Sequence, residues 1–247
     1  MNEAPMPGRR GASMRLRIAT GASTLALAAA LGCLTAVLLW KRYAGKPLNG
    51  LRFCLYALPL ALLFSHAGYC AVRAGFIAVD FTGDFWYRLD LGGYSLAGAS
   101  VGVLLAVWLF GRVSKTPFAT VADLAMPAAL VTLAGVRLGE RFTLDGVGKY
   151  VDNEALQWFP LAVKDTYGDF VMPVFVWEAL AALALCAGLL LWMRRAKRKP
   201  GDTALTGLLL LGLSQILLES LRADDYLRFG FVRINQLWGV ALALAAG

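Results

Sequence analysis

The sequence predicts an all-α, polytopic membrane helix bundle of about seven transmembrane helices with one long extracytoplasmic loop. Of its 247 residues, 59% are hydrophobic and only 16% are charged, whereas about a quarter of the residues in soluble domains are charged. The apolar residues gather in runs of the length that a membrane-spanning helix needs, about 20 residues. We expect spans at 19–40, 53–74, 93–111, 118–136, 171–193 and 204–221, and a weaker seventh span at 229–247.

The net charge of +8 does not indicate a nucleic-acid partner, because the basic residues lie in short clusters at the ends of the apolar runs. This distribution predicts contact with anionic lipid at the membrane surface. The four cysteines all fall inside apolar runs without metal-type spacing, so we expect no disulfide, metal site or cofactor.

Residues 1–18 form a basic N-terminal tail, and residues 19–247 form a single transmembrane domain. The tail and the apolar run after it resemble the start of a signal peptide, but the run continues for about 22 residues without a small-residue cleavage pattern. We therefore expect an uncleaved first span.

The loops between the predicted spans differ in charge from one side of the bundle to the other. The loops after the first, third and fifth spans are basic with almost no acid, while the polar connection at 138–170 lies on the other side with most of the acids. The positive-inside rule makes the basic side cytoplasmic and places the long loop and the N-terminus outside. The four arginines of the tail oppose this orientation. The predicted location is a cytoplasmic (inner) membrane, which the chain crosses several times.

A glycine pair followed by small residues opens the third span. Gly98 and Gly102 form a GxxxG pair, and Ser95 and Ala99 repeat the small-xxx-small spacing one position round the helix. This pattern is typical of close helix packing in a bilayer. The alternative is that the Gly-Gly turn and the small face, with Ser95 and Gly98, border a cavity that admits a lipid.

Several polar side chains lie inside the spans, where such residues usually face the bundle or a wet cavity. His66 and Tyr69 fall near one face of the second span, and either a functional role or a structural hydrogen bond explains them. Pro127 is expected to kink or break the fourth span. Glu178 lies near the start of the fifth span.

The sixth span ends in a polar stripe formed by Gln215, Glu219 and Arg222 at i, i+4 and i+7. A self-compensating Glu219–Arg222 pair is one interpretation. Arg137 ends the fourth span on the same predicted side as Arg222. Because two neighbouring arginines repel each other and Glu219 offsets them only in part, a lipid phosphate is the predicted third partner.

Five motifs occur in an order that is similar to one enzyme family. They are Gly92-Gly93-Tyr94-Ser95, Arg137-Leu138-Gly139, Trp177-Glu178, Glu219-Ser220-Leu221-Arg222 and Gln236. They resemble the GG-x-S-x-H-G-G, G-R-x-G-N-F, Q-L-Y-E and E-x-x-R motifs and the last glutamine of bacterial prolipoprotein diacylglyceryl transferase. The resemblance covers roughly residues 50–240.

The resemblance implies a transferase of lipoprotein biosynthesis that moves diacylglyceryl from phosphatidylglycerol to the lipobox cysteine of a prolipoprotein and releases glycerol 1-phosphate. Its implied partners are phosphatidylglycerol or another anionic phospholipid and the prolipoprotein signal peptide. Arg137 and Arg222 would hold the phosphate, and Glu219 would orient Arg222. The predicted substrate-binding residues are Arg137, Glu140, His66, Tyr69, Ser95, Gly98, Glu178 and Gln236.

This chain departs from the family's motifs at four positions. Ala97 replaces the histidine of the GG-x-S-x-H-G-G segment, Glu140 the asparagine after R-x-G, and Phe175 the glutamine before L-Y-E. His66 stands where the family has the arginine of G-A-R-L-G-Y. Two functions follow: a diverged transferase in which His66 or Glu140 replaces the missing histidine, or a non-catalytic paralogue that binds phospholipid or a partner protein. A small transporter is less favoured, because the sequence has no inverted repeat.

Overall fold

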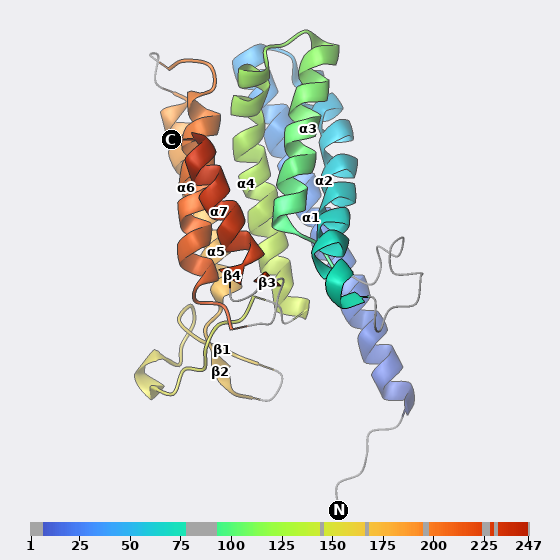
Figure 1. The fold of residues 1–247 in the computed structure, drawn as a ribbon, viewed down its shortest axis with the longest axis vertical. Helices are drawn as coiled ribbons and strands as arrows, with labels where there is room; N and C mark the ends of the chain where they lie inside the picture. The colour runs from blue at the N-terminus through green and yellow to red at the C-terminus, as the bar shows by residue number, and fades with distance from the viewer. Residues whose placement is uncertain are drawn as a thin grey trace, which may run out of the picture.

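The structure is a computed structural model that describes residues 7–77, 93–143, 146–165, 168–194, 198–223, 228–229 and 232–246. Within these ranges the chain forms seven helices: α1 (Pro7–Ala44), α2 (Pro47–Ile77), α3 (Leu96–Ser114), α4 (Phe118–Thr143), α5 (Val174–Trp192), α6 (Asp202–Glu219) and α7 (Ile234–Ala246). They run side by side, and α1 already begins within the predicted tail (Figure 1). The predicted all-α bundle is confirmed.

Six of these helices are long and apolar enough to cross a membrane. The predicted seventh span at 229–247 is wrong in length, because α7 has only 13 residues. At 1.5 Å per residue it extends about 20 Å, less than the roughly 30 Å of a hydrocarbon core. The fourth span is not broken at Pro127: α4 continues through it to Thr143.

Successive helices alternate in direction, so the connections between them lie alternately at the two ends of the bundle. The residues in these connections give the two ends different charges. The α1–α2, α3–α4 and α5–α6 connections lie at one end, and the long connection between α4 and α5 lies at the end where α1 begins (Figure 1). The basic residues Lys41, Lys46, Arg112 and Lys199 belong to the first end. We call it the basic end, and the opposite one the loop end.

The GxxxG pair of α3 packs directly on the backbone of α2. A Cβ atom added to Gly98 would lie 3.0 Å from Ser65 Cα and against the carbonyl of Phe64, and one added to Gly102 would lie 2.7 Å from the carbonyl carbon of Leu60. Only a glycine permits this approach. The contacts therefore favour the packing interpretation of Gly98 over a lipid-lined cavity on that face.

The connection between α4 and α5 is folded. It contains a short 3₁₀ helix, Glu154–Leu156, and a two-stranded antiparallel sheet of β1 (Val163–Lys164) and β2 (Phe170–Val171). It starts later than the predicted loop 138–170, because residues 138–143 are the last turns of α4, where Arg137 and Glu140 pair at i and i+3. A second short sheet, β3 (Arg228–Phe229) with β4 (Val232–Arg233), precedes α7.

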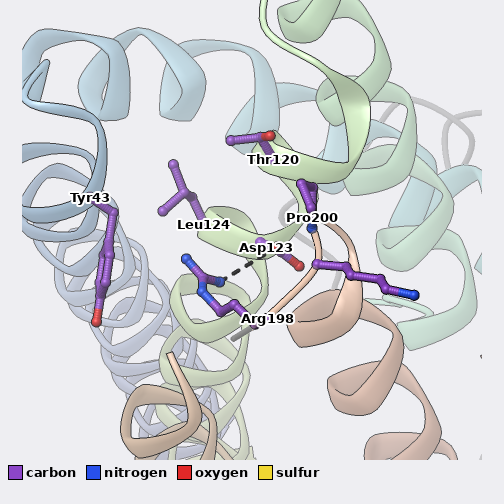
Figure 2. A pocket seen from close by; sticks show the side chains of 7 residues that line it. Tyr43, Thr120, Asp123, Leu124, Arg198 and Pro200 are labelled. Atoms are coloured by element: carbon purple, nitrogen blue, oxygen red, sulfur yellow. Dashed lines mark ion pairs between the residues drawn. The ribbon is translucent and has the colours of Figure 1, made fainter. Parts of the chain in front are cut away.

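At the basic end, the buried Asp123 of α4 holds the start of α6. Its two carboxylate oxygens each accept a backbone N–H at 2.9 Å, from Gly201 and Ala204, and Arg198 Nη1 lies 3.6 Å from Oδ2. Figure 2 shows this pair beside a pocket of about 130 Å³, which Tyr43 also lines. Arg198, in the basic run after α5, therefore has a structural role, because it pairs with Asp123. Asp123 in turn satisfies N–H groups that a helix start leaves unpaired.

Candidate functional site

Six charged side chains meet near the loop end of the bundle, where α4 and α6 end and α5 and α7 begin (Figure 1). Four different segments contribute them. The cluster, which we call the arginine–glutamate cluster, consists of Arg137, Glu140, Glu178, Glu219, Arg222 and Arg233. All are buried except Glu140, which is partly exposed. Charged groups this far out of water are stable only when they are paired.

Glu178 of α5 joins the two arginines that the sequence predicts to hold a phosphate. Its Oε2 atom lies 3.2 Å from Arg137 Nε and 3.2 Å from Arg222 Nη1. Arg137 also donates from Nη2 to Gln215 Oε1 at 3.4 Å. The two guanidinium groups come from positions 85 residues apart in the sequence, so the fold alone brings them together.

Glu140 also contacts both arginines. Arg137 Nη1 donates to its Oε1 atom, and Arg222 Nη1 lies 3.6 Å from its Oε2 atom. The side chain of Glu140 is 15% exposed, compared with 1% for Glu178. Glu140 is therefore the most exposed of the three glutamates, although its Oε2 atom is itself buried.

The third carboxylate, Glu219, contacts Arg233 at the end of β4 and Asn235 in the first turn of α7. Arg233 Nη1 lies 3.8 Å from Glu219 Oε1, and Asn235 Nδ2 lies 3.3 and 3.4 Å from its two oxygens. Arg222 Nε is 3.9 Å from the same carboxylate. Glu219, which is only 1% exposed, is thus shared between Arg222 and the start of α7.

The described residues of the cluster carry equal numbers of positive and negative charges. Three arginines face three glutamates among them, for a formal sum of zero. Glu140 and Glu178 thus join Glu219 as counter-ions of Arg137 and Arg222, whereas the sequence predicts Glu219 alone. The self-compensating Glu219–Arg222 pair is also incomplete as a description, since Arg222 lies closer to Glu178 than to Glu219.

The backbone around Arg222 is clamped from two sides. Arg222 lies beyond the end of α6 and pairs with Gly148 in an isolated antiparallel bridge, next to a hydrogen bond of 3.0 Å from Ala223 N to Val147 O. On the other side, Arg233 Nη2 donates to the carbonyl oxygen of Arg222 at 2.9 Å. The long loop and α7 therefore both fix the position of Arg222.

Glu178 Oε1 and Asn235 Oδ1 are buried acceptor oxygens of this region that have no hydrogen-bond partner among the described residues. Buried polar atoms in native proteins are nearly always paired, with protein groups or with water or a ligand. These two atoms are thus positions where a ligand hydroxyl or a water molecule would donate.

His66, Tyr69 and Ser95 lie around the turn that leads into α3. His66 Nδ1 is 3.1 Å from the carbonyl oxygen of Gly93, and its Nε2 is 3.5 Å from Cys70 Sγ. Gly93 has a φ of +83°, and a Cβ atom there would lie against the ring of Tyr69. This turn therefore requires a glycine. Gly92 lies outside the described residues.

Ser95 has a structural role at the same turn. Its hydroxyl accepts a hydrogen bond from Gly98 N at 3.3 Å and caps α3. Its backbone amide lies 3.0 Å from the carbonyl of Ser65 and 2.9 Å from the Ser65 hydroxyl. These contacts join α2 to the start of α3.

The remaining predicted site residue, Gln236, contacts the neighbouring backbone. Its Oε1 atom accepts a hydrogen bond from Arg233 N at 3.4 Å, so it supports the turn that presents Arg233. Sequence reasoning did not select Arg233 or Asn235. A polar pair directly before the last apolar run was the available signal, but its proximity to Glu219 depends on how α6 and α7 pack.

Six helices long and apolar enough to cross a membrane, with a buried arginine–glutamate cluster near one end, define the class as multi-pass integral membrane proteins. A sequence profile described as prolipoprotein diacylglyceryl transferase matches residues 14–247. The chain belongs to the prolipoprotein diacylglyceryl transferase family.

Curated relatives agree with this assignment. A phosphatidylglycerol–prolipoprotein diacylglyceryl transferase of Clostridium kluyveri is 30% identical over 84% of this chain and 83% of its own length. Proteins of the same name from Streptococcus pneumoniae and Bacillus licheniformis are 27% and 26% identical, over 88% and 78% of this chain and 84% and 72% of their own lengths. The chain is thus similar to these enzymes over most of its length.

Proposed function

We propose that this protein is a phosphatidylglycerol–prolipoprotein diacylglyceryl transferase of the bacterial inner membrane, with its site facing outward. The observation that carries the proposal is the convergence of Arg137 and Arg222 on one oxygen of Glu178, at 3.2 Å each. Two guanidinium groups at this spacing suit a lipid phosphate, since each can donate two parallel hydrogen bonds.

In the proposed reaction, the thiolate sulfur of the lipobox cysteine attacks the glyceryl carbon that carries the phosphate ester. A carbon–sulfur bond forms as the carbon–oxygen bond breaks, and the electron pair leaves with glycerol 1-phosphate. Arg137 and Arg222 stabilise the charge that develops on the leaving phosphate. Glu219 and Arg233 hold Arg222 in position. His66 and Glu140 are the candidates to accept the thiol proton in place of the family's histidine.

The unpartnered oxygens of Glu178 and Asn235 suit the same substrate. Phosphatidylglycerol carries a glycerol headgroup whose hydroxyls can donate to buried acceptors. A headgroup without any hydrogen-bond donor, such as choline, could not satisfy either oxygen. The two acceptors therefore support a donor lipid whose headgroup carries hydrogen-bond donors, as that of phosphatidylglycerol does.

The proposal is tested in cells depleted of their own transferase, with lipidation of a prolipoprotein as the readout. The wild-type chain should restore lipidation, and Arg137→Ala should abolish it. Arg137→Ala should also weaken binding of phosphatidylglycerol by about tenfold or more, because it removes charge-assisted hydrogen bonds. Arg137→Lys should bind more tightly than Arg137→Ala but less tightly than the wild type, since lysine keeps the charge but lacks the planar guanidinium group that donates two parallel hydrogen bonds.

Arg141 provides a matched control one helical turn further along α4. It is exposed and donates to the carbonyl of Lys164, so Arg141→Ala should leave both lipidation and binding near the wild-type level. Equal lipidation by wild type and Arg137→Ala would refute the proposed role of Arg137 in holding the lipid phosphate.

The non-catalytic paralogue is the second candidate function, and Ala97 favours it. A methyl group cannot take a proton where the family's segment has a histidine. Phosphatidylglycerol binding by the wild-type protein without any prolipoprotein lipidation would establish this alternative.

A further inference from the structure

Glu140 differs from the other carboxylates of the arginine–glutamate cluster in exposure: its side chain is 15% exposed, compared with 1% for Glu178 and Glu219. It touches Arg137 through one oxygen and Arg222 through the other, so its carboxylate bridges the two guanidinium groups. Glu178 joins the same two arginines but through a single, buried oxygen. An anion that contacts two arginines through two oxygens is the arrangement expected for a bound phosphate.

The net charge of the cluster also depends on the position of the Glu140 side chain. Among the described residues, the cluster sums to zero with Glu140 in place, and with its side chain turned outward three arginines face two glutamates, for a sum of +1. A buried cluster with this excess attracts one anion. The departure of Glu140 thus creates the positive charge that a phosphodiester would neutralise.

The long loop also contacts the carboxylate of Glu140. A Cβ atom on Gly146 would lie against Glu140 Oε2 and 2.9 Å from Phe175 Cβ. The carbonyl of Gly146 accepts a hydrogen bond of 2.9 Å from Phe175 N, which ties this part of the loop to the start of α5. The carboxylate of Glu140 therefore lies between the loop and the two arginines.

We propose that the Glu140 carboxylate occupies the position of the lipid phosphate between Arg137 and Arg222, and that the phosphate must displace it. This inference rests on the proposed function, which assigns the two arginines to the phosphate. Glu140 is then a specificity-determining residue. A free anion gains little by replacing a carboxylate of equal charge, whereas a phospholipid is confined to the bilayer beside the site, so its headgroup is present at a high effective concentration. The site therefore selects phosphate-bearing lipids over soluble phosphates.

The test measures binding of short-chain phosphatidylglycerol, and separately of inorganic phosphate, to the purified protein in detergent by calorimetric titration. Glu140→Gln keeps the shape of the side chain and removes its charge. It should tighten phosphatidylglycerol binding by about tenfold or more, because it removes a competing charge beside two arginines. It should also make inorganic phosphate binding measurable. Glu140→Asn serves as a second variant with a shorter neutral side chain.

Glu154→Gln is the matched control, since it removes the same charge from an exposed glutamate of the long loop that lies outside the cluster. It should change the affinity by less than about threefold. Equal tightening by Glu154→Gln and Glu140→Gln would overturn the inference, because the effect would then follow the net charge of the protein alone. Unchanged or weaker binding by both Glu140 variants would overturn it as well.

The gain in affinity should also require Arg137. Glu140→Gln combined with Arg137→Ala should therefore bind phosphatidylglycerol no more tightly than Arg137→Ala alone. The outcomes separate the inference from the proposed function. Tighter binding by Glu140→Gln in a protein that never lipidates a prolipoprotein refutes the transferase and supports the displacement. Lipidation by the wild type with no gain in Glu140→Gln supports the transferase and refutes the displacement.

Discussion

At the scale of single residues, Arg233 connects the charged cluster to the backbone that carries Arg222. One guanidinium nitrogen donates to the carbonyl of Arg222 at 2.9 Å, and another lies 3.8 Å from Glu219. Arg233 therefore acts on the position of Arg222 and supplies the third positive charge. A lysine could supply the charge but not reach both partners in the same way.

We expect Arg233→Met to weaken phosphatidylglycerol binding by about three- to tenfold, and to have no further effect when Arg222→Ala is already present. The reason is that residues which act through one another are not additive in a double-mutant cycle. Binding of the short-chain lipid by the two single variants and the double variant measures this coupling. Additive losses would mean that Arg233 acts on the lipid independently of Arg222.

Arg198→Met is the control for general damage to the fold. Arg198 is also paired with a buried acid, Asp123, but at the basic end of the bundle (Figure 2). Its replacement should lower the melting temperature and leave lipid binding by the folded protein unchanged.

At the scale of elements, the contact between α2 and α3 depends on glycine. Gly98→Leu should sharply reduce the yield of folded protein in detergent, since a side chain there must push the two helix backbones apart. Gly188 of α5 is the matched control, because a Cβ atom at that position meets no atom within 4 Å. Size-exclusion chromatography and thermal unfolding of both variants measure the difference. Equal yields of the two variants would show that the α2–α3 contact tolerates a large side chain.

At the scale of the whole molecule, the charges of the two ends predict the orientation in the membrane. The basic end should face the cytoplasm and the folded loop the outside. Asp152→Cys and Lys46→Cys place thiols at exposed positions on the loop and at the basic end. In intact cells an impermeant thiol reagent should label the first and spare the second. The reverse pattern would invert the topology.

The partly buried Cys33 is replaced by alanine in both labelling variants, since the other three cysteines are buried. After the cells are broken open, both positions should react. Labelling of Asp152→Cys only in broken cells would contradict the predicted orientation.

The sequence by itself determined the all-α membrane bundle, the approximate positions of six spans and the close approach at Gly98. These features follow from local composition, because long apolar runs and small-residue spacing are visible without knowing which helices are neighbours. The family's motifs also identified Arg137, Glu178, Glu219 and Arg222. The length of α7 was not determined in this way, since the apolar run before the end of the chain includes residues that fold as β4.

Only the tertiary structure decided how the charged residues are paired. Arg137, Glu178 and Arg222 lie on separate segments, and their meeting on a single carboxylate oxygen depends on the packing of α4, α5 and α6. The same packing made Glu140 a bridge between the two arginines and brought Arg233 against Glu219. Electrostatic energies depend on distance and burial, which spacing along the chain does not specify. For this reason the sequence predicted one counter-ion for Arg137 and Arg222, whereas the described residues provide three.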